Sequence, residues 1–174
     1  MAKLLLTLVG LMIIAPAMAR VPAEAKSNAG AIKNSWRGVT PLRSSVEDVA
    51  RAIGEGAEVT EGNVSGPYKV EGGEVTISFL TESIAKVYRA PRSMVGKVLT
   101  VYFRPGAPVT RAELNLSRAF KTCKESLAKS SYYLVSDAGL AYELRSSDNQ
   151  VETIIYQPTR AEIQRLWVNS ECVF

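Results

Sequence analysis

The sequence predicts an α+β fold: two tandem helix-plus-antiparallel-sheet units that form one curved antiparallel sheet, with helices on one face. Segments with alternating apolar residues, separated by short glycine-containing turns, predict antiparallel hairpins. An amphipathic helical period precedes the first hairpin. A strand that ends in proline occurs twice, as VLTVYFRP at 98–105 and VETIIYQP at 151–158, and Thr-Arg-Ala-Glu follows each copy.

The first 19 residues, MAKLLLTLVGLMIIAPAMA, have the layout of a secretory signal peptide. Lys3 is the one charge, an apolar run follows, and Ala17-x-Ala19 is typical of a cleavage site. The run is too short for a spanning helix, which needs about 20 apolar residues. We therefore expect an exported protein, periplasmic or secreted, with no transmembrane helix in its mature chain. The alternative is an uncleaved anchor. Arg20 follows in place of a cysteine, which excludes lipid attachment at this site.

The composition excludes several classes of function. With 21 Lys and Arg against 17 Asp and Glu, the chain has a mild positive excess and lacks the basic stripe of a nucleic-acid binder. It contains no histidine, which removes Ser-His-Asp and Cys-His catalysis and His-ligated zinc. We expect a protein that is not an enzyme and that has no cofactor and no metal.

Two cysteines, Cys123 and Cys172, remain after signal cleavage. In an oxidising compartment an even pair predicts one disulfide, which would close a loop of 49 residues. Such a loop is worth about 4 kcal/mol in the chain-entropy description. The alternative is two unrelated thiols.

After the signal, residues 20–35 carry no apolar period and are expected to form a disordered leader. A single α+β domain is expected over 36–174, made of two repeats at about 36–105 and 106–174.

The first repeat begins with a helix in which Ser44 and Glu47 form a capping box. Its apolar face consists of Val46, Val49, Ala50 and Ile53. Gly54 is expected to end the helix in the left-handed conformation. A hairpin with its turn at Gly72-Gly73, a polar connection over 81–96 and the strand at 98–105 complete the repeat.

The second repeat is expected to follow the same order. Thr110 and Glu113 predict another capping box, with a helix whose apolar face consists of Leu116, Phe120, Cys123 and Leu127. A hairpin turns at 137–139, the closing strand occupies 151–158, and a short helix runs toward Leu166. The alternating positions of the two hairpins correspond: Val75, Ile77 and Phe79 match Leu140, Tyr142 and Leu144.

The segment GVTPLRSSVEDVARAIGEG resembles the opening of small bacterial outer-membrane-assembly proteins of the SmpA/OmlA type. In that family, a short helix that ends in glycine is followed by a three-stranded antiparallel sheet. The tandem doubling of such a unit resembles the β-lactamase inhibitor protein fold. The chain departs from the assembly proteins in lacking their lipid-attachment cysteine. It also resembles exported bacterial proteins with no assigned activity.

Two catalytic patterns are rejected. Ser126-Leu127-Ala128-Lys129 and Ser147-Asp148-Asn149 fit two motifs of penicillin-recognising enzymes, but the third motif is missing and the chain is too short for that domain. Asp137 and Asp148 lie in expected turns, where aspartate is favoured because its side chain bonds nearby backbone amides.

The remaining candidates are surfaces for a partner. The segment KVYRAPRSMVGK carries Lys86, Arg89 and Arg92 and suits an anionic surface such as lipid headgroups or an acidic protein face. Exposed tyrosines suit protein recognition, and Tyr132, Tyr133 and Tyr142 are the candidates. Since adjacent strand residues point to opposite faces, either Tyr132 or Tyr133 should face outward.

These features favour an exported, non-enzymatic binding or envelope-associated protein that contacts another envelope or secreted protein, or an anionic surface, through an exposed sheet face. The main alternative is a periplasmic small-molecule or lipid carrier with an apolar pocket, and a third is a hydrolase that works without histidine.

Overall fold

The computed structural model describes residues 33–54, 58–60, 62–114, 116, 119–123 and 130–166. The expected signal peptide, most of the leader, Leu127, the Ser126–Lys129 motif and Cys172 lie outside the described residues.

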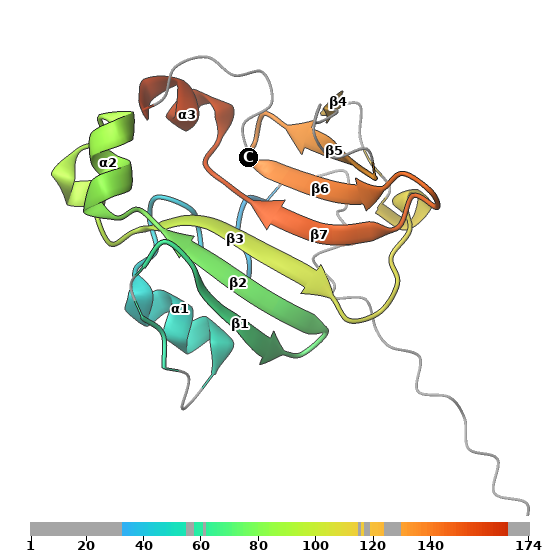
Figure 1. Ribbon diagram of the computed structural model, residues 1–174, viewed down its shortest axis with the longest axis horizontal. Coiled ribbons are helices and arrows are strands. Elements are labelled where there is room, and N and C mark those ends of the chain that lie inside the picture. Colours follow the sequence, from blue (N-terminus) through green and yellow to red (C-terminus); the bar gives the residue numbers. More distant parts are fainter. Residues whose placement is uncertain are drawn as a thin grey trace, which may run out of the picture.

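One seven-stranded antiparallel sheet dominates the fold, in the order β1-β2-β3-β7-β6-β5-β4 (Figure 1). The described chain is therefore mixed α+β. The strands are β1 (Ser65–Val70), β2 (Gly73–Phe79), β3 (Val98–Pro105), β4 (Phe120–Cys123), β5 (Ser131–Ser136), β6 (Leu140–Arg145) and β7 (Val151–Tyr156). Both expected hairpins are confirmed, and so is the expected strand that ends at Pro105. The other expected strand is present but ends at Tyr156, two residues before Pro158.

The two inner strand pairs have the same register. β2 pairs with β3, and β6 pairs with β7, through positions that the sequence aligns with each other. The pairs are Val75–Phe103, Ile77–Val101 and Phe79–Val98 in one, and Leu140–Tyr156, Tyr142–Ile154 and Leu144–Val151 in the other. Each ladder also has one irregularity, between Ser78 and Phe79 and between Glu143 and Leu144, which are again corresponding positions.

β3 and β7 join the two sets of strands at the centre of the sheet. Tyr102 pairs with Ile155, and the flanking pairs are Val101–Tyr156 and Phe103–Ile154. Since Val101 corresponds to Ile154 and Phe103 to Tyr156 in the sequence alignment, each strand meets its counterpart in a symmetric register.

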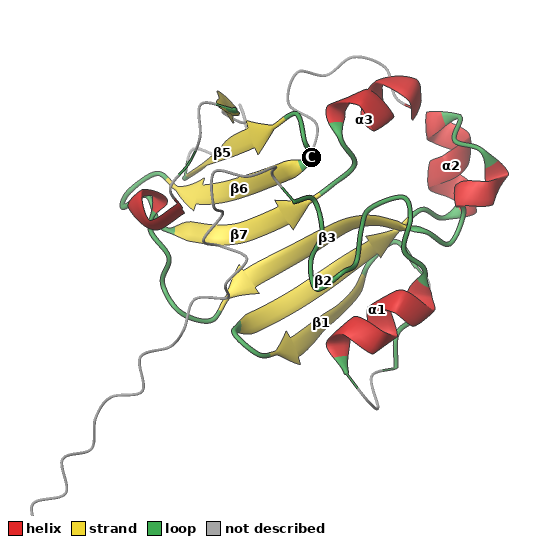
Figure 2. Cartoon of the chain, turned by 180° about the vertical axis from the view of Figure 1, so that it is seen from behind, coloured by secondary structure: helices red, strands yellow, loops and turns green. Residues whose placement is uncertain are grey.

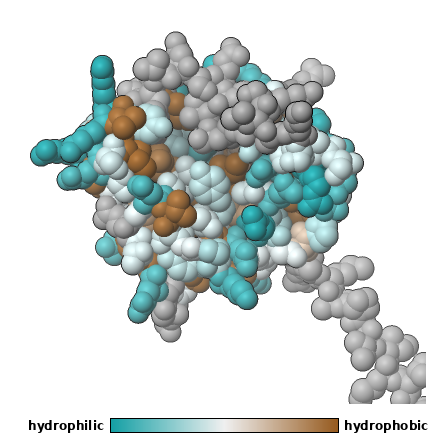
Figure 3. Space-filling model, viewed as in Figure 1, coloured by the Kyte–Doolittle hydropathy of each residue, from teal (hydrophilic) through white to brown (hydrophobic). Residues whose placement is uncertain are grey.

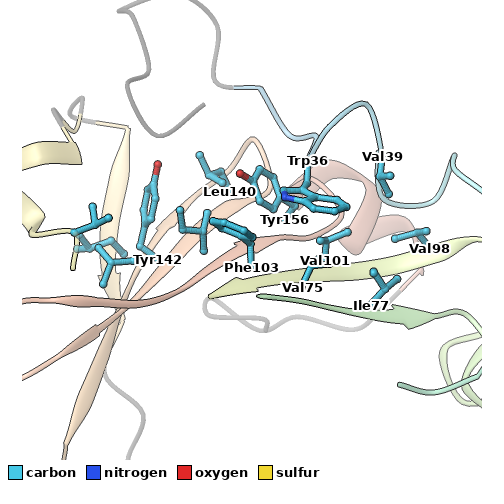
Figure 4. Packing of buried hydrophobic residues seen from close by; sticks show 14 of the residues in the cluster. Trp36, Val39, Val75, Ile77, Val98, Val101, Phe103, Leu140, Tyr142 and Tyr156 are labelled. Atoms are coloured by element: carbon cyan, nitrogen blue, oxygen red, sulfur yellow. The ribbon is translucent and has the colours of Figure 1, made fainter. Parts of the chain in front are cut away.

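The core lies on one face of the sheet. It gathers alternate residues of the inner strands with Trp36 and Val39 of the segment before the first helix (Figure 4). The Trp36 ring lies 6.4 Å from that of Phe103, and Phe120 lies 5.5 Å from Tyr142. Each large side chain buried in this way contributes about 1.5–3 kcal/mol relative to an exposed one.

Helix α1 (Val46–Ile53) packs on this core through Val46, Val49 and Ile53. Its cap lies one residue later than the expected Ser44–Glu47 pair: the Asp48 carboxylate accepts from the Ser45 N–H at 2.9 Å. Ser44 is engaged elsewhere, because its hydroxyl accepts from the Thr40 N–H and its carbonyl accepts from the Val98 N–H.

The end of α1 also differs from the expectation. Gly54 follows the helix with φ 125° and ψ 173°, so it does not adopt the left-handed helical conformation. The positive φ still favours glycine at this position.

The polar connection expected over 81–96 contains a helix that the sequence analysis missed. α2 (Glu82–Tyr88) begins after Thr81, whose hydroxyl accepts from the Ile84 N–H at 3.4 Å, and a 3-10 turn, η2 (Arg92–Met94), follows it. The signal was present: a threonine cap, an acid in the first turn and Lys86 in the last.

The helix expected after Thr110 is wrong. At its expected start the chain forms a single 3-10 turn, η3 (Arg111–Leu114). Phe120 and Cys123 belong to β4, where Phe120 pairs with Ser136 of β5 and Cys123 pairs with Tyr133. The spacing of the apolar residues favoured a helix, but pairing with the edge of β5 satisfies the backbone of both strands. Tertiary pairing therefore overrides the helical period.

The two Thr-Arg-Ala-Glu copies form the same local bonds. Glu113 accepts from the Thr110 N–H at 2.7 Å and from its hydroxyl at 2.8 Å. Glu162 accepts from the Thr159 N–H at 2.9 Å and from its hydroxyl at 2.8 Å. The second copy opens α3 (Arg160–Leu166), so the short helix expected there is confirmed.

The segment before α1 is bonded to the sheet. Asn34 donates to the carbonyl of Gln157 at 2.6 Å, which places part of the expected leader on the fold. Gly139 is required beside this contact, because it has φ 88° and a Cβ there would collide with Gln157 and Asn34.

The acid stability of the protein should depend on Glu162. Burial raises the pKa of Glu162, but hydrogen bonds from Thr159 and Arg43 outweigh burial and leave it below the usual 4.5. A carboxyl with a lowered folded-state pKa stabilises the protein above its unfolded pKa, and this contribution is lost as the pH falls through the folded value. Glu162→Gln should cost about 1 kcal/mol at neutral pH, the usual scale of a cap. It should also flatten the loss of stability below about pH 4.5.

Urea unfolding at stepped pH measures this effect, with Glu58→Gln as the matched control at an exposed glutamate. An identical acid profile for the wild type and Glu162→Gln would show that the cap does not stabilise α3.

Candidate functional site

The face of the sheet opposite the core has no helix over it in the part of the chain that the structure describes. Figure 1 looks onto this face, and Figure 2 shows the segment before α1 crossing the other one. α1 packs on the core side, whereas α2 and α3 lie beside the end of the sheet where β2 and β7 finish. We call this side of the sheet, over which no described helix lies, the open face.

Two cross-strand rows make up the centre of the open face. One is mostly apolar, and the other is polar and charged. The apolar row follows the pairs of Tyr102 with Ile155, Ile155 with Ala141, and Ala141 with Val135. The polar row follows the pairs of Lys69 with Glu74, Glu74 with Arg104, Thr153 with Glu143, and Glu143 with Tyr133.

The residues of these two rows differ in how far they are exposed to solvent and in polarity. Ile155 and Ala141 are buried, Tyr102 and Val135 are half-buried, and Arg104 is exposed. Burial raises the pKa of Tyr102, although a hydrogen bond with Thr100 acts against it. Figure 3, which shows the same side as Figure 1, has pale surface between teal charged side chains. This combination of aromatic, aliphatic and polar groups is typical of protein interfaces.

A polar groove of about 500 Å³ crosses the open face between the end of β3 and the β6–β7 pair. Arg104 lines one side and Glu143 the other. Glu143 accepts from the Thr153 hydroxyl at 2.9 Å and from the Tyr133 hydroxyl at 3.3 Å. Among the described residues, neither Arg104 nor Glu143 takes part in an ion pair within 4.0 Å. The groove therefore presents one cation and one anion that are not neutralised by each other.

The outer rim of the groove is a closed ion-pair network. Arg145 contacts Glu152 at 2.9 Å and Asp148 at 3.2 Å. The hydrogen bond with Glu152, together with the charges of both acids, raises the pKa of Arg145. These three residues hold one another in place, so Arg104 and Glu143 are the charged groups left for a ligand.

The structure separates the three candidate tyrosines. Tyr142 is buried at 2% exposure in the core, which corrects its assignment as a surface contact: position 142 belongs to the core-facing set of β6. Tyr132 packs at the edge of the core, and its hydroxyl donates to Asn149 at 2.6 Å. Tyr133 is the one that lies on the open face.

The basic candidates Lys86, Arg89 and Arg92 are all exposed, on α2 and just after it. α2 lies at the end of the sheet next to α3, where β3 begins (Figure 1). Arg104 lies near the other end of β3, and Tyr133 pairs with Glu143 near the end of β6. The structure therefore does not bring the predicted tyrosines and the predicted basic residues together.

Tyr102, Arg104 and Glu143 are not among the residues predicted from the sequence. The alternation within 98–105 could have indicated the first two. Thr100, Tyr102 and Arg104 alternate with the core residues of β3 and therefore lie on the other face of the strand. Glu143 could have been found as the outward position between Tyr142 and Leu144.

A second groove, of about 840 Å³, lies on the core side near η3. Leu116, Phe120 and Leu134 form its apolar part. Arg111 and Asn149 lie at its rim, where Arg111 donates to the Tyr132 hydroxyl at 3.4 Å.

The turn carboxylates have structural partners. Asp137 contacts Arg160 at 3.4 Å and Lys121 at 3.7 Å. Asp148 accepts from the Gln150 N–H at 3.1 Å. Within the described ranges, no group of three or more Cys, Asp or Glu side chains is arranged to hold a metal ion. The helices of this part of the chain are all too short or too polar to cross a membrane.

Comparison with protein families, curated proteins and solved structures gives no match to this chain. The resemblances to the SmpA/OmlA type and to the β-lactamase inhibitor protein fold stay predictions.

The position of Tyr142 predicts an alkaline transition. Burial raises the pKa of Tyr142 to about 12, from 10.0. A group with a raised folded-state pKa stabilises the protein fully below its unfolded value and loses that contribution as the pH rises through the folded one. Stability should therefore fall between about pH 10 and about pH 12, and Tyr142→Phe should reduce this fall.

Denaturant unfolding at stepped pH, followed by tyrosinate absorbance, measures the effect, and the chain held in denaturant gives the unfolded reference. Ionisation of every tyrosine near pH 10 in the folded protein would place Tyr142 in solvent and contradict its position in the core.

Proposed function

We propose that this chain is an exported, non-enzymatic binding protein that contacts another envelope or secreted protein through the open face. The observation that carries the proposal is the polar groove in which Arg104 and Glu143 lie without an ion-pair partner among the described residues. A protein segment with groups of opposite charge would complete both.

The surroundings of the groove support a protein partner. Tyr102 and Tyr133 flank it with aromatic area and polar tips, which are favoured in recognition surfaces. The alternating charges of Lys69, Glu74 and Arg104 along the polar row favour a partner of mixed charge, because electrostatic complementarity fixes the register of docking.

The alternative function is a carrier of a small molecule or lipid. The groove near η3 favours it, since its volume of about 840 Å³ falls within the usual range of ligand sites and part of its lining is apolar. Its polar rim, with Arg111 and Asn149, suits a ligand with a polar head.

The architecture is part of the proposal. We infer that the two sets of strands are tandem repeats of one unit. The support is the matched registers of β2–β3 and β6–β7, the shared position of their irregularities, and the symmetric pairing of β3 with β7. The helical parts have diverged, because β4 stands where the second repeat was expected to carry a helix.

Photo-crosslinking tests the open face. A photoreactive amino acid at Thr76 or Arg104 should give one adduct of defined mass in the envelope of the source cell. The same probe at Arg51, on the exposed side of α1, should give none. Charge reversal by Arg104→Glu should lower the yield from the Thr76 probe by at least about tenfold, because like charges across an interface cost several kcal/mol.

Equal adducts at all positions, or no protein adduct at Thr76 and Arg104, would contradict the open face as the contact. Lipid recovered with the purified chain, together with the absence of a protein adduct, would favour the carrier.

We also propose the disulfide between Cys123 and Cys172. Cys123 ends β4 with 7% exposure, and no cysteine of the described residues is a free thiol. Loss of the bond by Cys123→Ser should lower the free energy of unfolding by about 2–5 kcal/mol. The oxidised mature chain should have no thiol that reacts under denaturing conditions, and detection of two reactive thiols would contradict the bond.

A further inference from the structure

The outward side of α2 combines exposed apolar surface with basic residues. Val87 is 75% exposed and Tyr88 is 38% exposed, and these two and Val64 are the large hydrophobic residues exposed in the described chain. Figure 3 shows brown surface beside projecting teal side chains at the position that α2 occupies in Figure 1. We call Lys86, Val87, Tyr88, Arg89 and Arg92 the α2 patch.

The positive charges of the α2 patch are not neutralised within the described residues. Neither Lys86 nor Arg89 nor Arg92 takes part in an ion pair within 4.0 Å. Glu82, in the first turn of α2, is the one acid in 82–97. The acid of the neighbouring α3, Glu162, is already bound by Arg43 and Thr159.

We propose that the α2 patch docks the protein on an anionic phospholipid bilayer. The basic side chains would lie at the phosphate level, and Val87 and Tyr88 would enter the interface between headgroups and acyl chains. Lys and Arg bury their aliphatic stems along apolar surface while their charges stay hydrated, and tyrosine is enriched at the same depth of a membrane.

A bilayer fits the α2 patch better than an acidic protein does. The patch is a short convex helix with its following turn, and neither of the grooves described above includes its residues. Its charges are carried on separate long side chains, and anionic headgroups attract such residues as point charges. An exposed valine beside them adds nothing to an acidic protein face but gains contact with acyl chains.

This inference does not rest on the proposed contact of the open face. The α2 patch lies at the end of the sheet opposite the Arg104 groove, so the two surfaces can be altered separately. Bilayer docking would leave the groove accessible, because the length of β3 separates the two surfaces. β3 begins at the α2 end of the sheet, and Arg104 lies near its other end.

Vesicle flotation tests the inference with the mature chain from Arg20 onward. Vesicles of an equal mixture of phosphatidylglycerol and phosphatidylcholine should bind the protein, and pure phosphatidylcholine vesicles should not. Each basic residue near an anionic surface contributes about fivefold to partitioning, so the double charge reversal Lys86→Glu/Arg92→Glu should reduce it by at least about 25-fold. Raising salt from about 0.1 M to about 1 M shortens the screening length from about 10 Å to about 3 Å and should also release the protein.

Two further variants sharpen the test. Val87→Asp should lower partitioning by at least about tenfold, because it removes the apolar insertion and adds a negative charge. Lys69→Glu/Lys121→Glu makes the same change in net charge on the sheet and should reduce binding no more than about threefold. Circular dichroism checks that each variant is folded.

Absence of binding to the anionic vesicles would overturn the bilayer as the partner. Equal loss in the Lys69/Lys121 control and in the patch variants would overturn the patch as the site, because the effect would then follow net charge alone. Unchanged binding by the Lys86/Arg92 or the Val87 variant would also overturn it.

Discussion

The backbone pairing of β3 with β7 is the constraint on which the rest of the structure depends. Among the described strands, it is the one ladder that joins the first half of the chain to the second. Without it each half would be a small sheet with an unpaired edge, and such sheets are marginally stable in water. Because side chains alternate along a strand, the Tyr102–Ile155 register also decides which residues of both strands face the core.

That register produces the two unlike faces of the sheet. Val101 and Phe103 meet Ile154 and Tyr156 on the core side, where Trp36 and the segment before α1 pack against the sheet. Their neighbours Tyr102 and Arg104 are left on the open face beside Thr153 and Glu143. The proposed contact surface is therefore a consequence of the pairing: polar positions that could not enter the core collect on the open face. The α2 patch lies apart from it, since α2 belongs to the connection between β2 and β3.

Most of the strands could be predicted from the sequence because their signals are local. Val75, Ile77 and Phe79 alternate with polar residues, glycine marks the turn before them, and Pro105 ends β3. The similarity between the sequences of the two halves could also be recognised, because apolar residues occur at corresponding positions in both. The bonds of Thr110 with Glu113 followed from a four-residue pattern.

The errors have non-local causes. Phe120 and Cys123 have helical spacing, but they form β4 because β5 offers an edge to pair with, and nothing near them in the chain shows this. Ser44 was displaced as the cap by its bonds to Thr40 and Val98. Tyr142 could not be separated from Tyr133 by residue type, because only the register decides which of them is buried. The groove of Arg104 and Glu143 joins residues from two halves of the chain, so it required the fold.

Hydrogen exchange of the backbone amides tests the central role of β3–β7 most directly. If this ladder unites the sheet, the paired amides around Tyr102 and Ile155 will be among the slowest to exchange, and they will open together with those of β2 and β6 in one global unfolding step. If β1–β3 and β5–β7 instead open in separate steps, with the β3–β7 amides exchanging faster than either set, the two halves are independent and the account fails.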